Sequence, residues 1–286
     1  MSERSHVHLA LPARAENVVL VRELLAALAE SVDFGDALDD IKAAVSEACN
    51  NVVIHAYPDA EGLMEVDVGV VPGRLEVLVR DYGVGAARRA DDDETPGRGI
   101  GLAVIDALAA ESELRASRGE GVEVLMRFEI PDGGEGLAAA PVLGLEHRAL
   151  LEPPVFAACE VRLLVTPTSL SAPILERLLS ALGARAGFSI DRLSDAQLMS
   201  DALGARIEAV LDGGCVVLGL EALERAVAIR VGRLRQGGAA SLLAASAVGE
   251  LGAVIERLAD EVDVDDEGDA EVLGLLIRSP PPPTLL

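Results

Sequence analysis

Two polar side chains of complementary chemistry lie one helical turn apart in EACNNVVIH, residues 47–55. Glu47, Asn51 and His55 follow one another every fourth residue, so a helix would place them along one side. A carboxylate can orient or deprotonate an attacking hydroxyl, and an amide oxygen can bind Mg²⁺ that is shared with substrate phosphates. A stripe facing solvent would have the same spacing, but the apolar residues 52–54 favour a stripe inside a cleft.

A turn with one carboxylate and two glycines follows in RDYGVG, residues 80–85. The spacing of Asp81, Gly83 and Gly85 would let the backbone approach a flat ligand while the carboxylate accepts a hydrogen bond from it. The amino group of adenine is the obvious donor. Asp and Gly also populate ordinary turns, so this segment alone leaves both interpretations open.

A third segment, GRGIGL, precedes an apolar helical stretch. Gly97, Gly99 and Gly101 would expose backbone N–H groups at the beginning of a helix, an arrangement suited to phosphates. Arg98 could add a charge-assisted contact. The acidic residues 86–96 before it predict a mobile lid, although glycine triplets are also common in plain flexible connections. No G-x-x-x-x-G-K-[ST] pattern is present, which excludes a P-loop.

Patterned elements surround these segments. Alternation over residues 7–11 predicts a strand, and amphipathic patterns predict helices over 16–30 and 36–55. We expect strands at 64–70 and 75–80 with a turn at 72–73, a helix at 102–110 and a final strand at 122–130. This order predicts a two-layer α/β sandwich with a mixed, mostly antiparallel sheet.

Together, in this order and spacing, the three segments resemble the Bergerat-fold (GHKL) ATP-binding family of gyrase, Hsp90, histidine kinases and MutL. Within this histidine kinase-like ATPase family, E-x-x-x-N-x-x-x-H-A-Y and G-R-G-x-G-L are most similar to the bacterial anti-sigma-factor serine kinases. A compact domain over residues 1–130 agrees with that group.

The resemblance implies ATP and Mg²⁺ as cofactors and a role for each matching residue. Asn51 would ligate Mg²⁺ between the ATP phosphates, and Glu47 would be the catalytic base. Asp81 would bind the adenine amino group. The glycines would shape the adenine pocket (Gly83, Gly85) and close over the phosphates (Gly97, Gly99, Gly101), with Arg98 beside them.

One position departs from the family. The final hairpin usually carries Gly-Thr, whose hydroxyl helps to fix the adenine, whereas this chain has Gly121-Val122. The departure predicts weaker ATP binding.

Kinases of this group phosphorylate a serine on a small anti-anti-sigma (STAS-type) protein and otherwise sequester a sigma factor. The resemblance therefore implies an ATP-dependent protein serine/threonine kinase that regulates transcription. The alternative is a non-catalytic ATP-binding switch or scaffold that docks a signalling partner through its second domain.

Composition limits the other functions. The 286 residues include 24 Lys and Arg against 48 Asp and Glu, a net charge of −24, and half are hydrophobic. Such acidity disfavours nucleic acids and anionic membranes as direct partners. No apolar run is long enough to span a membrane, and three well-separated cysteines favour reduced thiols in the cytoplasm.

The second half resembles the first. LLAAL at 24–28 matches LLSAL at 178–182, and the strand at 7–11 matches 161–165. We expect a linker at 131–158, a second copy at 159–278 and a Pro-rich tail at 279–286. This alignment places Asn51 on Ala205 or Arg206 and Asp81 near Val231, so it predicts a degenerate Bergerat-like domain without nucleotide residues, and an intramolecular pseudo-dimer.

Overall fold

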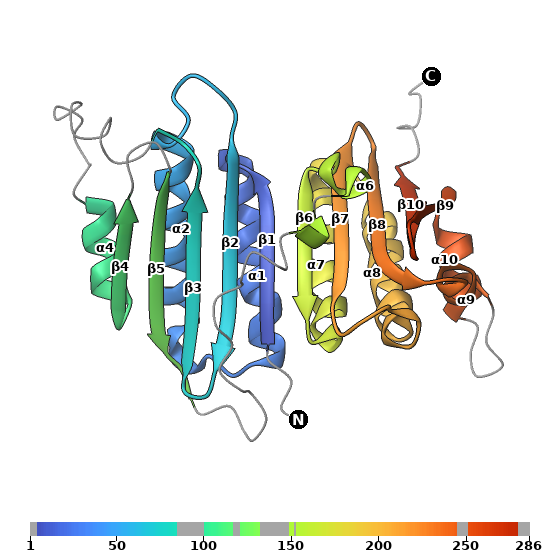
Figure 1. Ribbon diagram of the computed structural model, residues 1–286, viewed down its shortest axis with the longest axis horizontal. Helices are drawn as coiled ribbons and strands as arrows, with labels where there is room; N and C mark the ends of the chain where they lie inside the picture. Colours follow the sequence, from blue (N-terminus) through green and yellow to red (C-terminus); the bar gives the residue numbers. More distant parts are fainter. Residues whose placement is uncertain are drawn as a thin grey trace. The chain divides into compact units, whose positions relative to one another are not determined.

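Figure 1 shows the computed structural model, which describes residues 5–84, 100–116, 121–131, 149–151, 153–244 and 251–279. The chain forms two compact units, Met1–Arg148 and Ala149–Leu286. In the described residues, no helix has both the length and the apolar character needed to cross a membrane.

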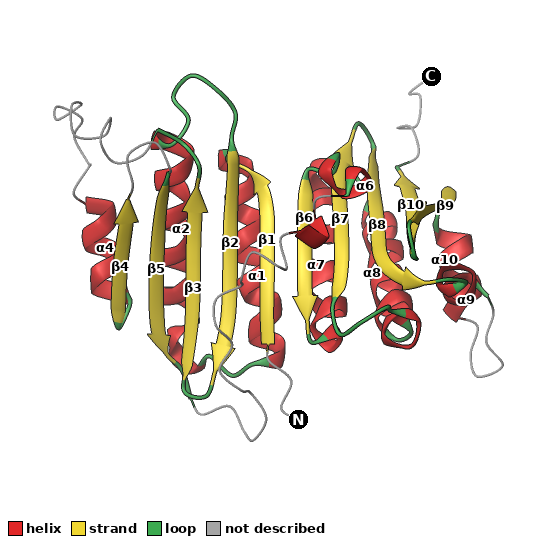
Figure 2. Ribbon diagram, in the orientation of Figure 1, coloured by secondary structure: helices red, strands yellow, loops and turns green. Residues whose placement is uncertain are grey.

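The first unit is an antiparallel sheet with helices on one face (Figure 2). Its strands lie side by side in the order β4-β5-β3-β2-β1. Along the chain the elements are β1 (Ser5–Pro12), α1 (Val18–Ser31), α2 (Leu38–His55), β2 (Leu63–Val71), β3 (Arg74–Asp81), α4 (Ile100–Leu108), β4 (Glu111–Ala116) and β5 (Val122–Glu129).

Alternation along the strands builds the core between the sheet and the helices. Val7, Leu9 and Leu11 of β1 are buried, and the ladder places Val7 opposite Val68 of β2. Leu24, with its neighbours on the apolar side of α1, is fully buried. The hydrophobic period of two in strands and about 3.6 in helices therefore positions α1 and α2 on the sheet.

Every element expected in the first half is present within a few residues, and the prediction of a mostly antiparallel sheet with helices is confirmed. Strand β4 is an addition to the elements that the sequence predicts. Its sequence, ESELRA, lacks apolar alternation, and the described side chains at 111–115 are exposed. The strand forms because β5 offers an edge, along which Glu111 pairs with Arg127.

The second unit has a similar order of elements. They are β6 (Val161–Thr166), α7 (Ser171–Arg185), α8 (Ile190–Gly204), β7 (Val216–Leu223), β8 (Ala226–Arg235), α9 (Gly238–Leu243), α10 (Leu251–Leu258), β9 (Glu261–Glu267) and β10 (Ala270–Arg278). Its sheet order is β6-β7-β8-β10-β9, the counterpart of β1-β2-β3-β5-β4. The short helix α9 has no counterpart among the described residues of the first unit.

The last part of the segment expected as a linker packs on this second unit. Residues Ala149–Leu151 form a 3-10 turn and α6 (Pro154–Ala157) a single helical turn. Leu151 and Phe156 are buried in one cluster with Val217. Two glycines make room for Phe156, because a Cβ would lie 3.1 Å from its ring at Gly219 and 2.2 Å at Gly232.

Candidate functional site

Helix α2 presents the polar stripe that the sequence predicts. One side of the helix enters the core, where Ile41, Val45 and Cys49 are fully buried. Glu47 and Asn51 are half-buried on another side, one turn apart. They are thus held on a rigid element at the edge of the core.

The beginning of α4 lies against this stripe. A Cβ on Gly101 would lie 2.3 Å from Oε1 of Glu47 and 3.2 Å from Nδ2 of Asn51. The structure therefore brings together Glu47, Asn51 and the last glycine of GRGIG. The other residues predicted for this region, Gly85, Gly97, Arg98 and Gly99, lie outside the described residues.

The turn after β3 holds the buried carboxylate. Asp81 is the last residue of the strand and is 1% exposed, and its Oδ1 accepts a hydrogen bond from the backbone N–H of Gly83 at 2.9 Å. The turn is tied to the end of α2, because the N–H of Val84 donates to the carbonyl of Ala56 at 3.0 Å. A Cβ on Gly83 would lie 2.0 Å from that carbonyl oxygen. Glycine is therefore required there by close backbone approach.

Tyr57 forms a second tie between α2 and the turn. Its hydroxyl donates to the carbonyl of Leu63 at 2.6 Å and accepts from the backbone N–H of Tyr82 at 2.8 Å. Burial raises the pKa of Tyr57, so the phenol keeps the proton that it donates. In the sequence, Tyr57 is only the last residue of the H-A-Y motif, and no role is predicted for it. Its position just after the helix was the one feature that could have suggested this tie.

Gly121 lies beside the same turn, directly before Val122, the residue that differs from the family pattern. Gly121 has φ +82, and a Cβ there would lie 1.9 Å from the carbonyl oxygen of Asp81. Val122, the next residue, is buried. The position where the family carries threonine thus follows a glycine that lies against the backbone of Asp81, and it has an apolar side chain in place of a hydroxyl.

The donor set fits a metal shared with phosphates. No group of three or more His, Cys, Asp or Glu that could hold a metal ion occurs among the described residues. Mg²⁺ is usually bound through one or two protein oxygens, with phosphates and water completing its coordination. Asn51 and Glu47 beside the beginning of a helix match that requirement, and the buried Asp81 carboxylate matches an adenine amino group.

The second unit has different chemistry at the corresponding positions. The ladders place Val68 opposite Val77 in one unit and Leu220 opposite Ile229 in the other. Four residues beyond Val77 stands Asp81, and four beyond Ile229 stands Arg233. The sequence alignment had placed Asp81 near Val231; the strand register moves its counterpart to Arg233, because a shared turn, rather than residue similarity, sets the pairing.

A cationic side chain also follows α8. Arg206 donates to the carbonyls of Ser241 at 2.7 Å and Ala244 at 2.8 Å, at the end of α9. The beginning of α9 is bound by Glu271, which accepts from the N–H groups of Gly237 and Ala239 at 2.6 and 3.0 Å. These contacts hold α9 in place, and the Arg206 guanidinium has no acceptor atom for Mg²⁺ or for an adenine amino group.

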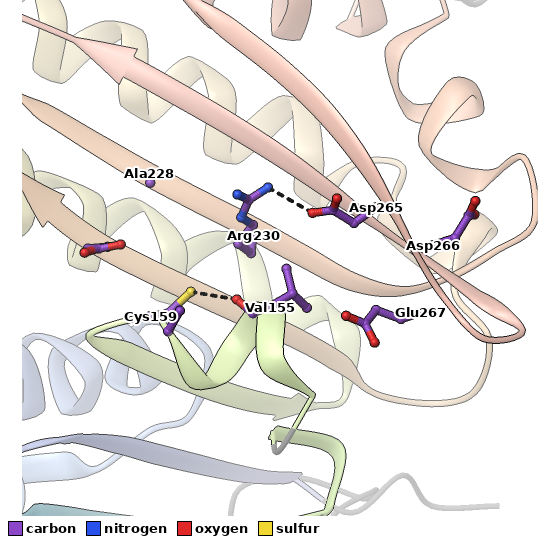
Figure 3. A pocket seen from close by; sticks show the side chains of 9 residues that line it. Val155, Cys159, Ala228, Arg230, Asp265, Asp266 and Glu267 are labelled. Carbon is purple, nitrogen blue, oxygen red and sulfur yellow. Dashed lines mark hydrogen bonds and ion pairs between the residues drawn. The ribbon is translucent and has the colours of Figure 1, made fainter.

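The second unit also contains a hollow of about 440 Å³ between α6 and strands β7, β8 and β9 (Figure 3). Its charged lining is mostly acidic: Glu221, Asp265, Asp266 and Glu267, with Arg230 3.5 Å from Asp265. Burial raises the pKa of Cys159, at its edge, to about 11, so this thiol is neutral and a weak nucleophile. The excess of carboxylates in this hollow opposes binding of a phosphate group.

Known proteins match this chain over its first unit. Residues 11–128 match the model of the histidine kinase-like ATPase domain. The serine-protein kinase RsbW of Bacillus thuringiensis (strain Al Hakam) is 33% identical over 140 residues, which cover 44% of this chain and 86% of that protein. RsbW of Bacillus mycoides (strain KBAB4) is 32% identical over 139 residues, with the same coverage.

Solved structures align over more of the chain but poorly. The RsbU and RsbW domains of Rv1364c from Mycobacterium tuberculosis are 11% identical, with 97% of this chain and 88% of that chain covered, at a TM-score of 0.28. For crystal form I of TP0453 the identity is 12%, the coverage 95% and 88%, and the TM-score 0.36. These scores are too low to support a conclusion about fold or function.

Proposed function

The chain belongs to the RsbW family of histidine kinase-like ATPases, and on this premise we propose that it is an ATP-binding anti-sigma factor with protein serine kinase activity. The observation that carries the proposal is the meeting of Glu47, Asn51 and Gly101 at one point, where α4 lies against α2, a helix whose other side is buried. This meeting supports the proposed roles of Glu47 as general base and Asn51 as metal ligand beside a helix N-terminus that would bind phosphate.

Each residue of the site has a task in phosphoryl transfer. ATP would supply the phosphoryl group and leave as ADP, and Mg²⁺ would supply positive charge that offsets the charge of the phosphates. Asn51 would hold the metal through its amide oxygen, and Asp81 would accept a hydrogen bond from the adenine amino group. Glu47 orients the serine hydroxyl of the protein substrate and takes its proton. Because such transfer depends mainly on positioning, few residues are needed.

The proposed partners are a sigma factor, which the chain sequesters, and a STAS-type anti-anti-sigma protein, which it phosphorylates. The net charge of −24 supports a basic protein surface as partner and opposes direct contact with nucleic acid. The proposal implies action in the cytoplasm, where sigma factors work.

Transfer from labelled ATP to a STAS protein tests the kinase. We expect Glu47→Ala to abolish transfer while Mg-ATP still binds, as measured by calorimetry. Asp40→Ala, which removes an exposed carboxylate in the first turn of the same helix, should leave transfer unchanged. Failure of the native chain to bind Mg-ATP would refute the proposal.

A non-catalytic ATP-binding switch is the second candidate. It is favoured by Val122, an apolar residue in place of the family's threonine, and by the presence of a second compact unit, through which a partner would dock. ATP binding without transfer to any STAS protein would support this candidate over the kinase.

We further propose that the second unit is a duplicated domain that has lost its nucleotide residues. The shared order of strands and the matching ladders support a common origin. Calorimetry should give one ATP per chain, and two would contradict the loss. An intramolecular pseudo-dimer remains a prediction; an obligate dimer in size-exclusion chromatography with light scattering would count against it.

A further inference from the structure

We infer that the hydroxyl of Tyr57 is a positioning group, which holds the adenine-binding turn against α2 and thereby sets the affinity and base selectivity of the nucleotide site. The inference rests on the proposed function, because it requires Asp81 to receive adenine. It assigns a task to a residue that touches neither the phosphates nor the metal in that proposal.

The hydroxyl replaces a rung of the β2–β3 ladder. The last pair of that ladder is Met64 opposite Asp81, and the pair that would follow is Leu63 with Tyr82. There the hydroxyl of Tyr57 stands between the two backbones, donating to the carbonyl of Leu63 at 2.6 Å and accepting from the N–H of Tyr82 at 2.8 Å. One oxygen atom therefore joins the end of α2, the beginning of β2 and the end of β3.

This bridge fixes the peptide group that follows Asp81, whose carboxylate is proposed to bind adenine. The Tyr82 N–H belongs to the peptide group joining it to Asp81, so its hydrogen bond restrains the backbone that carries the Asp81 side chain. Two further bonds complete the turn: Gly83 N–H to Asp81 Oδ1 at 2.9 Å and Val84 N–H to the Ala56 carbonyl at 3.0 Å. Removal of the Tyr57 hydroxyl would remove this hydrogen bond to the Tyr82 N–H, and with it one restraint on the orientation of the Asp81 carboxylate.

The same helix carries the phosphate end of the site. Glu47 and Asn51 lie on α2, and Tyr57 comes two residues after its last residue, His55. Because the helix is rigid and packed into the core, the bridge fixes the distance between adenine recognition and metal binding. A nucleotide whose base fits the turn then presents its phosphates to Asn51 without a further ordering cost.

The aromatic ring of Tyr57 has a separate, structural role. It packs on Gly62, where a Cβ would lie 2.0 Å from Cε1 of the ring. Tyr57→Phe keeps this packing and removes only the hydroxyl. Ser112→Ala is the control, because it removes a hydroxyl of the same unit that donates to Asp106 on α4, outside the adenine-binding turn.

Calorimetry on the full chain with Mg-ATP, Mg-GTP and Mg-tripolyphosphate tests the inference, with thermal unfolding in the absence of nucleotide as a check on folding. We expect Tyr57→Phe to weaken ATP binding about tenfold, as the loss of two shared hydrogen bonds would. Tripolyphosphate binding should be unchanged and the preference for ATP over GTP should fall. Ser112→Ala should keep ATP affinity within about twofold of the native value.

The outcomes separate this inference from the proposed function. If the native chain binds no ATP, the proposed function fails and the inference with it. If the native chain binds ATP and Tyr57→Phe binds it equally well, only the inference is overturned. Equal losses of ATP and tripolyphosphate binding would also overturn it, because they would show a general structural role instead of adenine positioning.

Discussion

Gly101→Ala should separate catalysis from stability. The new Cβ would lie 2.3 Å from Oε1 of Glu47 and 3.2 Å from Nδ2 of Asn51. The closer atom is the far end of a flexible side chain, so the helices need not move apart. Glu47 has to retreat instead, by about 1 Å to reach ordinary contact distance. A displacement of about 1 Å can cost a catalytic step roughly 100-fold.

The fold should tolerate the same change. Gly101 is the second residue of α4, and no positive φ is found there. Alanine is favoured over glycine inside helices by up to about 1 kcal/mol, which offsets the crowding at Glu47. We therefore expect the free energy of unfolding to stay within about 1 kcal/mol of the native value, and Mg-ATP affinity to change much less than the transfer rate.

Single-turnover transfer from labelled ATP to a STAS protein measures the rate, with calorimetry and thermal unfolding beside it. Gly69→Ala on β2 is the matched control, because a Cβ there meets nothing within 4 Å. Since the effect acts through Glu47, adding Gly101→Ala to Glu47→Gln should slow transfer no further. A native transfer rate in Gly101→Ala, or an additional loss in the double variant, would refute the reasoning.

Three further predictions concern other parts of the chain. Asp81→Asn should weaken ATP binding roughly 10- to 100-fold, as loss of a charged acceptor does, and calorimetry should show Mg-tripolyphosphate unaffected. Gly232→Ala puts a Cβ 2.2 Å from the Phe156 ring; we expect a loss of about 1–3 kcal/mol of stability by denaturant unfolding, and native stability would contradict the packing. Burial raises the pKa of the Asp67 carboxyl, but the two histidines beside it outweigh burial and lower the pKa to about 2. The stabilisation that comes from this lowered pKa is present above the unfolded value near 4 and is lost as the pH falls towards 2. The free energy of unfolding of the native chain should therefore drop by about 2 kcal/mol more than that of Asp67→Asn over this range. Equal pH dependence of stability in the two proteins would contradict the prediction.

The sequence predicted most of the first unit because its core residues repeat with clear periods. Helix α2 and strands β2 and β3 appear where the alternation of apolar residues places them. Strand β4 escaped because its pairing with β5, and not its own residues, makes it a strand. In the second unit, the alignment of the two halves put the counterpart of Asp81 near Val231, and the strand register puts it at Arg233.

Residue types and spacing alone determined which chemistry this chain can attempt: a carboxylate and an amide one turn apart, a carboxylate in a glycine turn and a glycine-rich segment before a helix. Only the tertiary structure decided how these groups meet. Gly101 fits against Glu47, and the Tyr57 hydroxyl replaces a hydrogen-bonded pair between Leu63 and Tyr82. Both contacts join residues that are distant in the sequence. Local patterns record the period of an element, whereas such contacts depend on how helices and strands pack, and no local pattern carries that information.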